Sequence, residues 1–558
     1  NSVATTTDLG KKVTTVNLED VATAQVLTFD AALTAATLGV NNVTGNKNID
    51  VTNGGTALKT LTINASGKAS SITLVNTAAD IETLNITGKA DLTLATTLAT
   101  IKTVDGSKAE GKLVLSKLAT MTSVKTGSGN DTVTVAFAVA SGETINLGAG
   151  NDKLVAGGGT IAAGSIIDGG AGIDSLDAAL VTAGNAGVFA NFETLSLGTI
   201  DADLDLALVN KSTFTTIAID GNSAGSTVRN VSTSQSLAVN AAGTSTTLLF
   251  KNVDGKADAY KINFNADNAA NTNAGTVVIN KIETVTVNSV GKTGVANTIT
   301  LTDDAAKSLV ITGDKALTVD FAVAGFGDTA TATNGLGVST IDASASTAGI
   351  TLGTSISNLK TAWSGLTIKG GAGKDTIDMT GLILPATDSK IIVNAGAGDD
   401  TIVTTLAGGT LTGGAGKDMF NIAASVLGGG ELTEATGVVK VTITDLTAGD
   451  TIKFANNGTE AFNKTNTITS FRSIVNINAN IQNRNLLLQC IPSNNYRYPT
   501  SGVGLIKYLH ANLSHSGLAE KLQTEFKDDK VEIINAAFNS YSGDLELDLD
   551  FSEADAGV

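Results

Sequence analysis

The sequence predicts an all-β protein built as a right-handed parallel β-solenoid. Three observations support this prediction. The 558 residues include 61 Gly but only 3 Pro, 3 Met, 1 Trp and 1 Cys. Short apolar stretches rich in threonine recur about every 20 residues, and Gly-Asp turns recur in two clusters. Repetitive β-structure needs this mixture, because its turns take Gly, Asn and Asp and its strands take β-branched residues.

A four-residue pattern repeats in the first 125 residues. Its copies are Leu58-Lys-Thr-Leu61, Ile81-Glu-Thr-Leu84, Ile101-Lys-Thr-Val104 and Met121-Thr-Ser-Val124, whose first residues are 23, 20 and 20 positions apart. Each copy lies in a stretch too short to bury its own apolar face, so the copies should stack into one continuous core.

Two later copies, Phe192-Glu-Thr-Leu195 and Ile282-Glu-Thr-Val285, extend the pattern into the middle of the chain. We therefore expect a related but more decorated β region there. A β-sandwich made of 8–12-residue strands remains an alternative for this part.

Composition divides the chain into four predicted regions. They are a β-solenoid with the first Gly-Asp cluster (1–185), a middle β region (186–365), a second roll with the other cluster (366–455) and a C-terminal module (456–558). The sequence does not begin with Met, and we expect it to start inside a longer protein.

The C-terminal module is predicted to be a small α+β unit. Leu518, Leu522 and Phe526 recur at helical spacing, and Ile534, Phe538 and Tyr541 nearly do, so both stretches favour helix. The stretch DLELDLDF (544–551) alternates strictly and predicts a strand.

Charge and composition exclude several classes of protein. The net charge is −17 and the pI is about 4.6, which argues against nucleic acid or an anionic membrane surface as partner. No run approaches the roughly 18 apolar residues of a membrane span, so we expect no membrane insertion. A single cysteine excludes an intramolecular disulfide.

The pattern G-x-G-x-D, followed after one residue by an apolar residue, occurs six times in two clusters. The first cluster contains Gly127, Gly129, Asp131, Gly148, Gly150, Asp152, Gly170, Gly172 and Asp174. The second contains Gly371, Gly373, Asp375, Gly396, Gly398, Asp400, Gly414, Gly416 and Asp418. A looser copy ends at Asp328.

These loops predict several Ca²⁺ sites. Glycines let the backbone turn sharply and expose its carbonyls, and Ca²⁺ takes six to eight oxygen ligands from carbonyls and carboxylates. Repeats of this kind bind calcium in parallel β-helices. One loop supplies only part of a shell, so loops must stack. Asp400 and Asp418 are 18 residues apart, as one roll turn of two nonapeptides requires, while Asp131, Asp152 and Asp174 follow at 21 and 22. The alternative is a set of ordinary Gly-Asp turns.

The segment from Ile443 to Ile452 follows the second cluster. It fits either a strand segment that ends a roll or a plain hairpin with a Gly-Asp turn.

No motif predicts an enzyme. Ser223 lies in a G-x-S-x-G match, but the residues after it form a poor helix. Gly291-Lys-Thr293 lacks the earlier glycine that a phosphate-binding loop needs, and His510 and His515 do not form H-E-x-x-H. Cys490 has no reactive context in the sequence.

The GGAGKD and GAGDD loops, the LKTLTI and IETLNI stretches and the Thr/Ala/Asn/Val composition together resemble RTX-type surface-layer proteins of Gram-negative bacteria, over about residues 1–455. The resemblance implies an RTX β-roll, calcium ligation by the six aspartates and glycine carbonyls, and secretion to the cell surface by a type I system. It also implies self-assembly into a two-dimensional lattice (S-layer) and attachment to lipopolysaccharide through an N-terminal region that we expect to be missing here.

Residues 456–558 depart from the Thr/Ala/Gly-rich ending of that family. They are either the secretion signal or a separate interaction domain. Two other functions remain open: a secreted RTX adhesin, and the non-catalytic carrier part of a type I-secreted hydrolase or toxin. An adhesin would show tandem domains of about 100 residues and a carrier would show denser nonapeptides. Neither is evident, which favours the lattice.

Overall fold

The computed structural model describes residues 5–454 and the strands at 531–538 and 545–551. Within 5–454 it leaves out 11, 54, 76–80, 199–202, 222–224, 254–256, 329–336, 383, 385–389, 405–408, 423–440 and 448. The chain forms two compact units, Asn1–Val310 with Asp320–Asp328 and Ile311–Val319 with Thr329–Val558. Each unit is described by itself.

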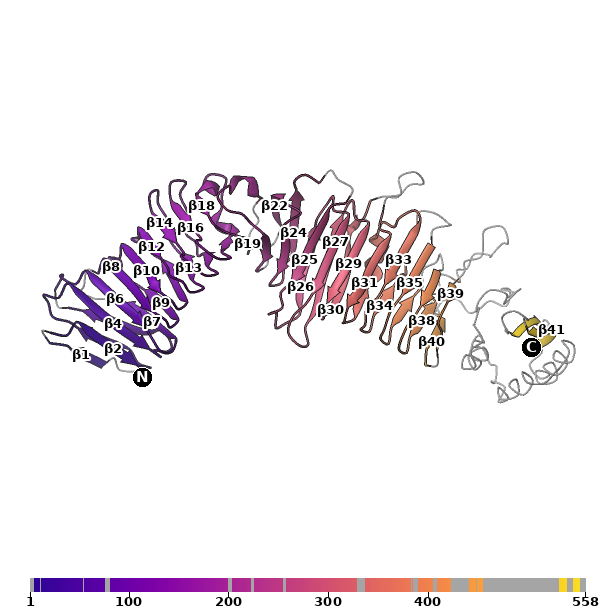
Figure 1. Cartoon of the computed structure of the whole chain (residues 1–558), viewed down its shortest axis with the longest axis horizontal. Coiled ribbons are helices and arrows are strands. Elements are labelled where there is room, and N and C mark those ends of the chain that lie inside the picture. The colour runs from indigo at the N-terminus through magenta and orange to yellow at the C-terminus, as the bar shows by residue number, and fades with distance from the viewer. Residues whose placement is uncertain are drawn as a thin grey trace, which may run out of the picture. The chain divides into compact units, whose positions relative to one another are not determined.

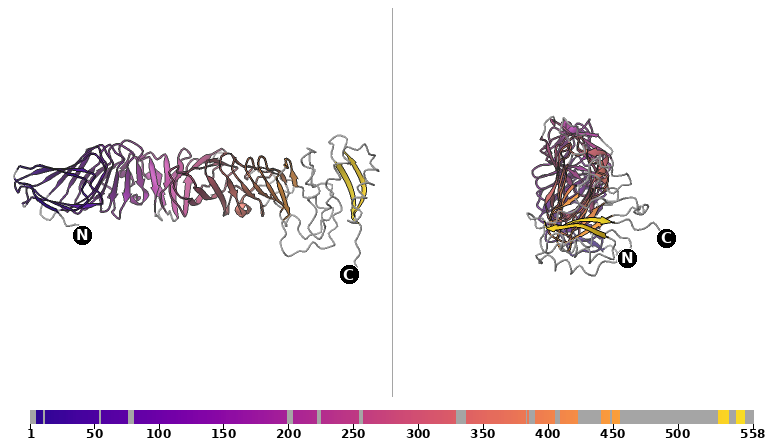
Figure 2. Two further views of the ribbon diagram at one scale, coloured as in Figure 1. Left: turned by 90° about the horizontal axis from the view of Figure 1, so that it is seen from below. Right: turned by 90° about the vertical axis from the view of Figure 1, so that its right-hand side faces the viewer.

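The first unit is a stack of parallel coils, so the predicted parallel β-solenoid is confirmed (Figure 1). Odd-numbered strands pair in one sheet: β1 (Thr5–Asp8), β3 (Gln25–Thr28), β5 (Lys47–Thr52), β7 (Ser70–Val75), β9 (Leu92–Thr96), β11 (Leu113–Lys117), β13 (Thr132–Val135), β15 (Lys153–Ala156), β17 (Ser175–Asp177), β19 (Thr194–Leu197), β21 (Thr216–Ile219), β23 (Ser236–Val239), β25 (Ala259–Phe264) and β27 (Thr284–Ser289). Figure 2 shows these strands lying side by side from one coil to the next.

Even-numbered strands form two further sheets in this unit. The first has nine strands: β2 (Thr15–Glu19), β4 (Ala35–Asn41), β6 (Thr60–Ala65), β8 (Thr83–Gly88), β10 (Thr103–Ala109), β12 (Ser123–Lys125), β14 (Thr144–Asn146), β16 (Ile166–Asp168) and β18 (Phe189–Ala190). The other includes β20 (Asp203–Asp205), β22 (Ser226–Val231), β24 (Ser245–Phe250), β26 (Thr272–Val278) and β28 (Ala296–Asp303). The unit boundary passes through β29 (Ser308–Gly313) and β30 (Ala316–Phe326).

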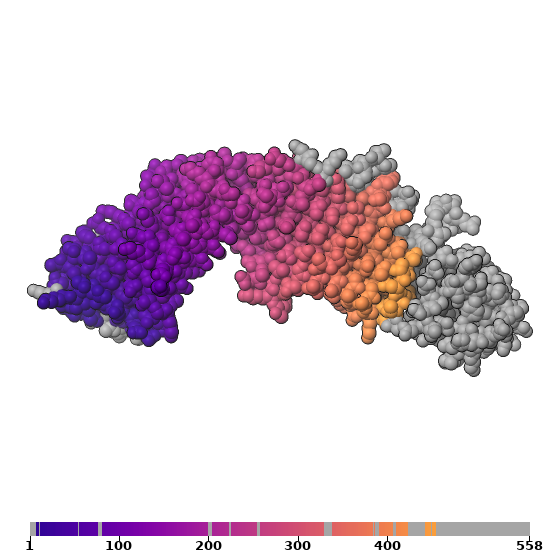
Figure 3. Space-filling model, viewed as in Figure 1, coloured from indigo at the N-terminus to yellow at the C-terminus, as the bar shows by residue number. Residues whose placement is uncertain are grey.

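The repeated four-residue pattern forms the core of the first coils. Leu61, Leu84, Val104 and Val124 occupy matching positions on β6, β8, β10 and β12. All four side chains are at most 1% exposed, because alternate residues of a strand face the inside of the coil. The space-filling view shows neighbouring coils in close contact along the visible face (Figure 3).

The middle region continues the same coils, and the sandwich alternative is wrong. β21, β23, β25 and β27 pair in parallel, as do β22, β24, β26 and β28. Among its described residues, this region adds short 3-10 helices to the coils, namely η2 (Ala186–Val188), η3 (Leu206–Leu208) and η4 (Thr354–Asn358), and η1 (Ala178–Leu180) lies just before it. Leu195 and Val285 of the two later pattern copies are buried inside.

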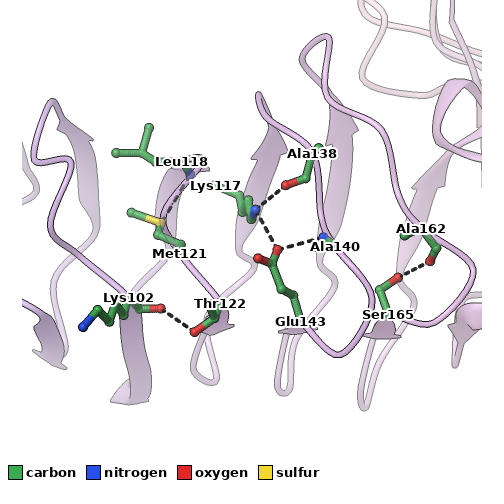
Figure 4. Close-up of polar contacts among 10 residues, drawn as sticks. All are labelled: Lys102, Lys117, Leu118, Met121, Thr122, Ala138, Ala140, Glu143, Ala162 and Ser165. Atoms are coloured by element: carbon green, nitrogen blue, oxygen red, sulfur yellow. Dashed lines mark hydrogen bonds and ion pairs between the residues drawn. The ribbon is translucent and has the colours of Figure 1, made fainter.

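One core position of the first unit holds an ion pair. Lys117 at the end of β11 is 1% exposed and occupies the position that Val135 takes on the neighbouring strand. Its Nζ donates to the Ala138 carbonyl and lies 2.8 Å from Glu143 Oε2, which also accepts from the Ala140 N–H at 3.0 Å (Figure 4). The charge is buried only because these oxygens replace water around it.

The second unit is also a parallel solenoid. One row of strands comprises β31 (Thr340–Ser346), β33 (Gly365–Lys369), β35 (Lys390–Asn394), β37 (Gly409–Thr412) and β39 (Val441–Ile443). The other comprises β32 (Ile350–Leu352), β34 (Thr376–Asp378), β36 (Thr401–Val403), β38 (Met419–Ile422) and β40 (Thr451–Phe454), and η4 (Thr354–Asn358) is its one described helix. Thr401 pairs with Met419, so this coil is 18 residues long, as two nonapeptides predict.

The hairpin alternative for Ile443–Ile452 is wrong. β39 pairs in parallel with β37, whereas β40 pairs in parallel with β38. The segment is therefore one more coil of the solenoid and places its two strands in different rows.

The C-terminal strands confirm one prediction and correct another. The last seven residues of DLELDLDF form β42 (Leu545–Phe551), antiparallel to β41 (Val531–Phe538). The helix predicted around Ile534 and Phe538 is wrong, because a spacing of four residues is also a multiple of the strand period of two. The helix predicted at 518–526 lies outside the described residues, and the four domain boundaries stay predictions.

Candidate metal centre

The Gly-Asp loops lie at coil corners, where one strand ends and the next begins. The first stack comprises loops 127–131, 148–152 and 169–174, which precede β13, β15 and β17. The second stack comprises loops 370–375, 396–400 and 413–418, which precede β34, β36 and β38. The structure therefore brings the predicted residues of each cluster together, one loop per coil, as their spacing predicts.

An apolar residue two positions after each aspartate fixes the loops in register. Val133, Leu154 and Leu176 pair across β13, β15 and β17, and all are at most 1% exposed. Ile402 and Phe420 do the same in the second stack, at 0% exposed. Burial of these side chains in the coil holds the adjacent aspartates at the same corner.

The six aspartates form two hydrogen-bonded ladders. In the first stack the Asp131 N–H donates to Asp152 Oδ1 at 2.7 Å, and the Asp152 N–H donates to Asp174 Oδ1 at 2.8 Å. In the second, the Asp375 N–H donates to Asp400 Oδ1 at 2.7 Å and the Asp400 N–H to Asp418 Oδ1 at 3.0 Å.

All six carboxylates are buried, at most 2% exposed. In each carboxylate, Oδ1 accepts a hydrogen bond from a backbone N–H of the preceding coil. The partner of the second oxygen, Oδ2, decides what else the site can bind.

The second oxygen divides the loops into two kinds. In the first loop of each stack, Oδ2 accepts from the loop's own backbone: Asp131 from Gly127 at 2.9 Å and Asp375 from Gly371 at 2.8 Å. In the four later loops the Oδ2 atoms are buried without a hydrogen-bond partner: those of Asp152, Asp174, Asp400 and Asp418. An unpaired buried carboxylate oxygen is costly, so these four positions require a proton or a cation.

The glycine backbone differs in the same way. Gly148, Gly150, Gly170, Gly172, Gly396, Gly398, Gly414 and Gly416 all have positive φ, whereas the glycines of the first loops do not. These eight glycines approach the preceding loop closely; a Cβ on Gly172, for example, would lie 1.7 Å from the Gly150 carbonyl oxygen. Only glycine permits one loop to pack this closely on the carbonyls of the loop before it.

Burial raises the pKa of all six carboxyls. The pKa of Asp152 rises to about 7, mainly through loss of hydration and further through the charges of Asp131 and Asp174. Burial raises the pKa of Asp174 to about 6 and that of Asp400 to about 7. Without a cation, part of each ladder therefore holds protons near neutral pH.

Sequence reasoning missed a second ladder that runs beside the first. The residue before the aspartate accepts from the following loop: Asn130 Oδ1 from the Asn151 N–H at 2.8 Å, and Asp399 Oδ1 from the Lys417 N–H at 2.8 Å. The Asn-Asp and Asp-Asp pairs in the loops were the available signal.

Sequence reasoning also missed the carboxylate that follows the last loop aspartate of each stack. Glu193 Oε2 accepts from the Asp174 N–H at 2.9 Å, and Asp450 Oδ1 accepts from the Asp418 N–H at 2.8 Å. Asp450 precedes Thr451-Ile452 as the loop aspartates precede their strands, so this signal was in the sequence. Glu193 stands in the repeated pattern and gave no such signal.

Ca²⁺ could be held at these corners only through mixed ligation. Within the described part of the chain, no group of three or more His, Cys, Asp or Glu side chains is placed to hold a metal ion. A shell here must therefore combine one or two carboxylates with main-chain carbonyls, which is a set that Ca²⁺ accepts.

The remaining predicted positions lie elsewhere. Gly327, in the looser copy, donates its N–H to the Asp303 carbonyl at 2.8 Å and joins neither stack. Lys292 lies in a turn, where its N–H donates to the Asn268 carbonyl at 2.9 Å. Ser223, Cys490 and both histidines are outside the described residues.

Comparison with known proteins adds no identity. No protein-family model matches the chain, and no curated protein matches it either. Among the residues that the structure describes, no helix has the length and apolar character needed to cross a bilayer.

Proposed function

We propose that this chain is a structural protein of the outer cell surface. Calcium completes its coils, and copies of the chain assemble into a two-dimensional layer. The observation that supports calcium binding is the set of four buried carboxylate oxygens without a partner, in loops whose glycines pack closely on the carbonyls of the preceding loop.

Calcium would act through folding. Without it, unpaired carboxylates and flexible glycines oppose order in the loops. At a concentration ten times Kd, one site contributes roughly 1.4 kcal/mol. Four sites would contribute about 6 kcal/mol, similar to the whole stability of a typical domain. Extracellular calcium modules bind at about 10⁻⁴–10⁻³ M, so folding would depend on reaching a calcium-rich medium.

Hydrogen exchange on the full chain tests calcium binding. In chelator we expect protection to fall at 127–177 and 370–422 while β4 to β8 keep theirs. Asp152→Asn and Asp400→Asn retain the Oδ1 acceptor but remove a ligand, and should weaken the calcium response. Asp105→Asn is the control, because Asp105 lies on β10, outside the loops of both stacks. Equal protection with calcium and with chelator would refute the calcium role.

The coils offer a repeating surface for self-assembly. Thr60, Thr83, Thr103, Ser123 and Thr144 occupy matching outward positions on five successive strands of the nine-stranded sheet. A column of identical groups suits contact between identical copies.

Electron microscopy of the purified chain with and without millimolar calcium tests the layer. Calcium-dependent sheets support it. Calcium-stable monomers would instead favour the adhesin or the carrier.

The other parts of the proposal follow from the family resemblance. The chain would leave the cell through a type I system and would be held to lipopolysaccharide by another region of the protein. Secretion of a fusion carrying residues 456–558 would test the first of these. A fusion that stays inside cells with a working type I exporter would assign this module another role.

A further inference from the structure

The repeated four-residue pattern places a glutamate at the same position in three copies, with three different surroundings. Glu82 forms ion pairs with Lys59 at 3.2 Å and Lys102 at 2.9 Å. Glu283 lies 3.8 Å from Lys307 Nζ. The structure pairs Glu193 with none of the described lysines, and instead sets it at the end of the first stack.

Glu193 stands on the coil that follows the last Gly-Asp loop. Its Oε2 accepts from the Asp174 N–H at 2.9 Å, which is the role that each loop aspartate plays for the loop before it. β19, which begins at Thr194, pairs with β17 next to Asp174. Glu193 therefore continues the aspartate ladder by one coil.

Asp174, the last loop aspartate at this end of the stack, has a free carboxylate oxygen. Asp174 is 0% exposed and its Oδ2 has no hydrogen-bond partner. Gly169 of the same loop lies close against the next coil: a Cβ there would lie 2.1 Å from the Asn191 carbonyl oxygen and 3.0 Å from Asp174 Cβ. The carbonyl of the next coil therefore comes near the Asp174 side chain.

Asn191 is held in place for this arrangement. Its φ is 57°, and its Nδ2 donates to Asp168 Oδ1 at 2.8 Å. Asp168 Oδ1 also accepts from the Gly170 N–H at 3.1 Å. Asp168 thus binds the loop that carries Asp174, and Glu193 accepts from the Asp174 N–H, so three carboxylates gather at this end of the stack. A divalent cation would offset the repulsion among them.

We propose that Asp174 and Glu193 hold a Ca²⁺ ion at the end of the first stack, with the Asn191 carbonyl as a further ligand. The G-x-G-x-D pattern does not encode this site, because Glu193 and Asn191 come from the next coil. The inference rests on the proposed calcium role of the stacks.

The second stack ends differently. Asp450 also accepts from the last loop aspartate, but its Oδ2 accepts from the Thr447 N–H at 2.6 Å and from Thr447 Oγ1 at 3.1 Å. Both oxygens of Asp450 are used within the protein. This end is closed by hydrogen bonds, and the extra site belongs to the first stack alone.

Calcium binding to the full chain tests the site, with equilibrium dialysis to count bound ions. Glu193→Gln keeps an acceptor for the Asp174 N–H but loses the charge. We expect it to bind one Ca²⁺ fewer per chain, or to bind that ion at least tenfold more weakly. Glu82→Gln changes the same position of the pattern where lysines are the partners, and should bind as the wild type does. Glu193→Asp should keep the ion with reduced affinity.

The outcomes separate this inference from the function on which it rests. If wild type binds no Ca²⁺, the proposed function falls and this site falls with it. If wild type binds several ions and Glu193→Gln binds as many with equal affinity, only the end site is refuted. Thermal melting in chelator checks whether the variant still folds. If Glu193→Gln melts at the wild-type temperature in chelator but binds one Ca²⁺ fewer in the dialysis experiment, Glu193 ligates the ion. If Glu193→Gln melts at a lower temperature than wild type in chelator but binds as many Ca²⁺ ions, ligation is refuted and Glu193 has a structural role.

Discussion

Two glycines of the first unit have nearly the same φ but different neighbours. Substituting each with alanine therefore distinguishes the cost of backbone strain from the cost of a clash between stacked coils. Gly170 has φ +101° and Gly158 has φ +98°. A Cβ on Gly170 would lie 1.9 Å from the Gly148 carbonyl oxygen, whereas a Cβ on Gly158 would meet nothing within 4 Å. Gly170→Ala and Gly158→Ala therefore share the cost of a left-handed alanine, about 1–2 kcal/mol.

Only Gly170→Ala must also push two coils apart. The methyl group requires a shift of more than 1 Å by ordinary contact distances, and overpacking of this kind costs about 1–3 kcal/mol. The shift also strains the Ala171 N–H to Gly148 carbonyl bond of 2.9 Å, which is one of the bonds that join the loops. Its loss adds about 1 kcal/mol. We expect Gly170→Ala to cost about 3 kcal/mol more than Gly158→Ala.

Hydrogen exchange in saturating calcium measures the difference locally. A cost of about 3 kcal/mol corresponds to roughly a 100-fold loss of protection. We expect the loss of protection at 169–177 in Gly170→Ala to exceed the loss around residue 158 in the control by that factor. The control itself, at about 1–2 kcal/mol, should lose protection roughly 5- to 30-fold. Equal effects at the two sites would show that the loops do not stack in the register described, and would remove the basis of the proposed metal centre.

Three further predictions follow from the same structure. In chelator, the free energy of unfolding should fall as pH rises from about 4 to about 7, because folding raises the pKa of Asp152 and of Asp400 to about 7 and the folded chain therefore binds more protons than the unfolded one. The loss is about 1.4 kcal/mol per unit of pKa shift at each site. Urea titrations at pH 5 and pH 7.5 measure it, and a rise in stability with pH would contradict it. Phe420→Ala should lower the free energy of unfolding by about 3–5 kcal/mol, since this side chain is 0% exposed beside the second stack. It should also weaken the response to calcium, and an unchanged calcium titration would show that the core and the loops are independent. Lys117→Met should cost about 3 kcal/mol by leaving Glu143 unpaired, and adding Glu143→Leu should recover most of it; a double variant as unstable as the single one would show that packing, rather than charge, sets the cost.

The repeated pattern could be recognised from the sequence because its signals are local. Leu61 and Leu84 alternate with polar residues at strand period, and their spacing matches one coil. The Asp400 to Asp418 spacing of 18 gave the coil length of the second unit for the same reason. The pattern at Ile534 and Phe538 misled, because a four-residue spacing suits a helix and a strand alike, and the pairing of β41 with β42 decides between them.

The sequence by itself determined that the chain coils in parallel, where each coil turns and which aspartates sit at the corners, because strand alternation and glycine-aspartate turns depend on residues close together in the chain. Only the tertiary structure decided which carboxylate oxygens are free. Asp131 and Asp152 both end a G-x-G-N-D pattern, yet the Gly127 N–H occupies Oδ2 of the first while Oδ2 of the second is left without a partner. The role of Glu193 was decided in the same way. The partner of each oxygen depends on loop conformation and on the register between coils about 20 residues apart, and no local pattern carries that information.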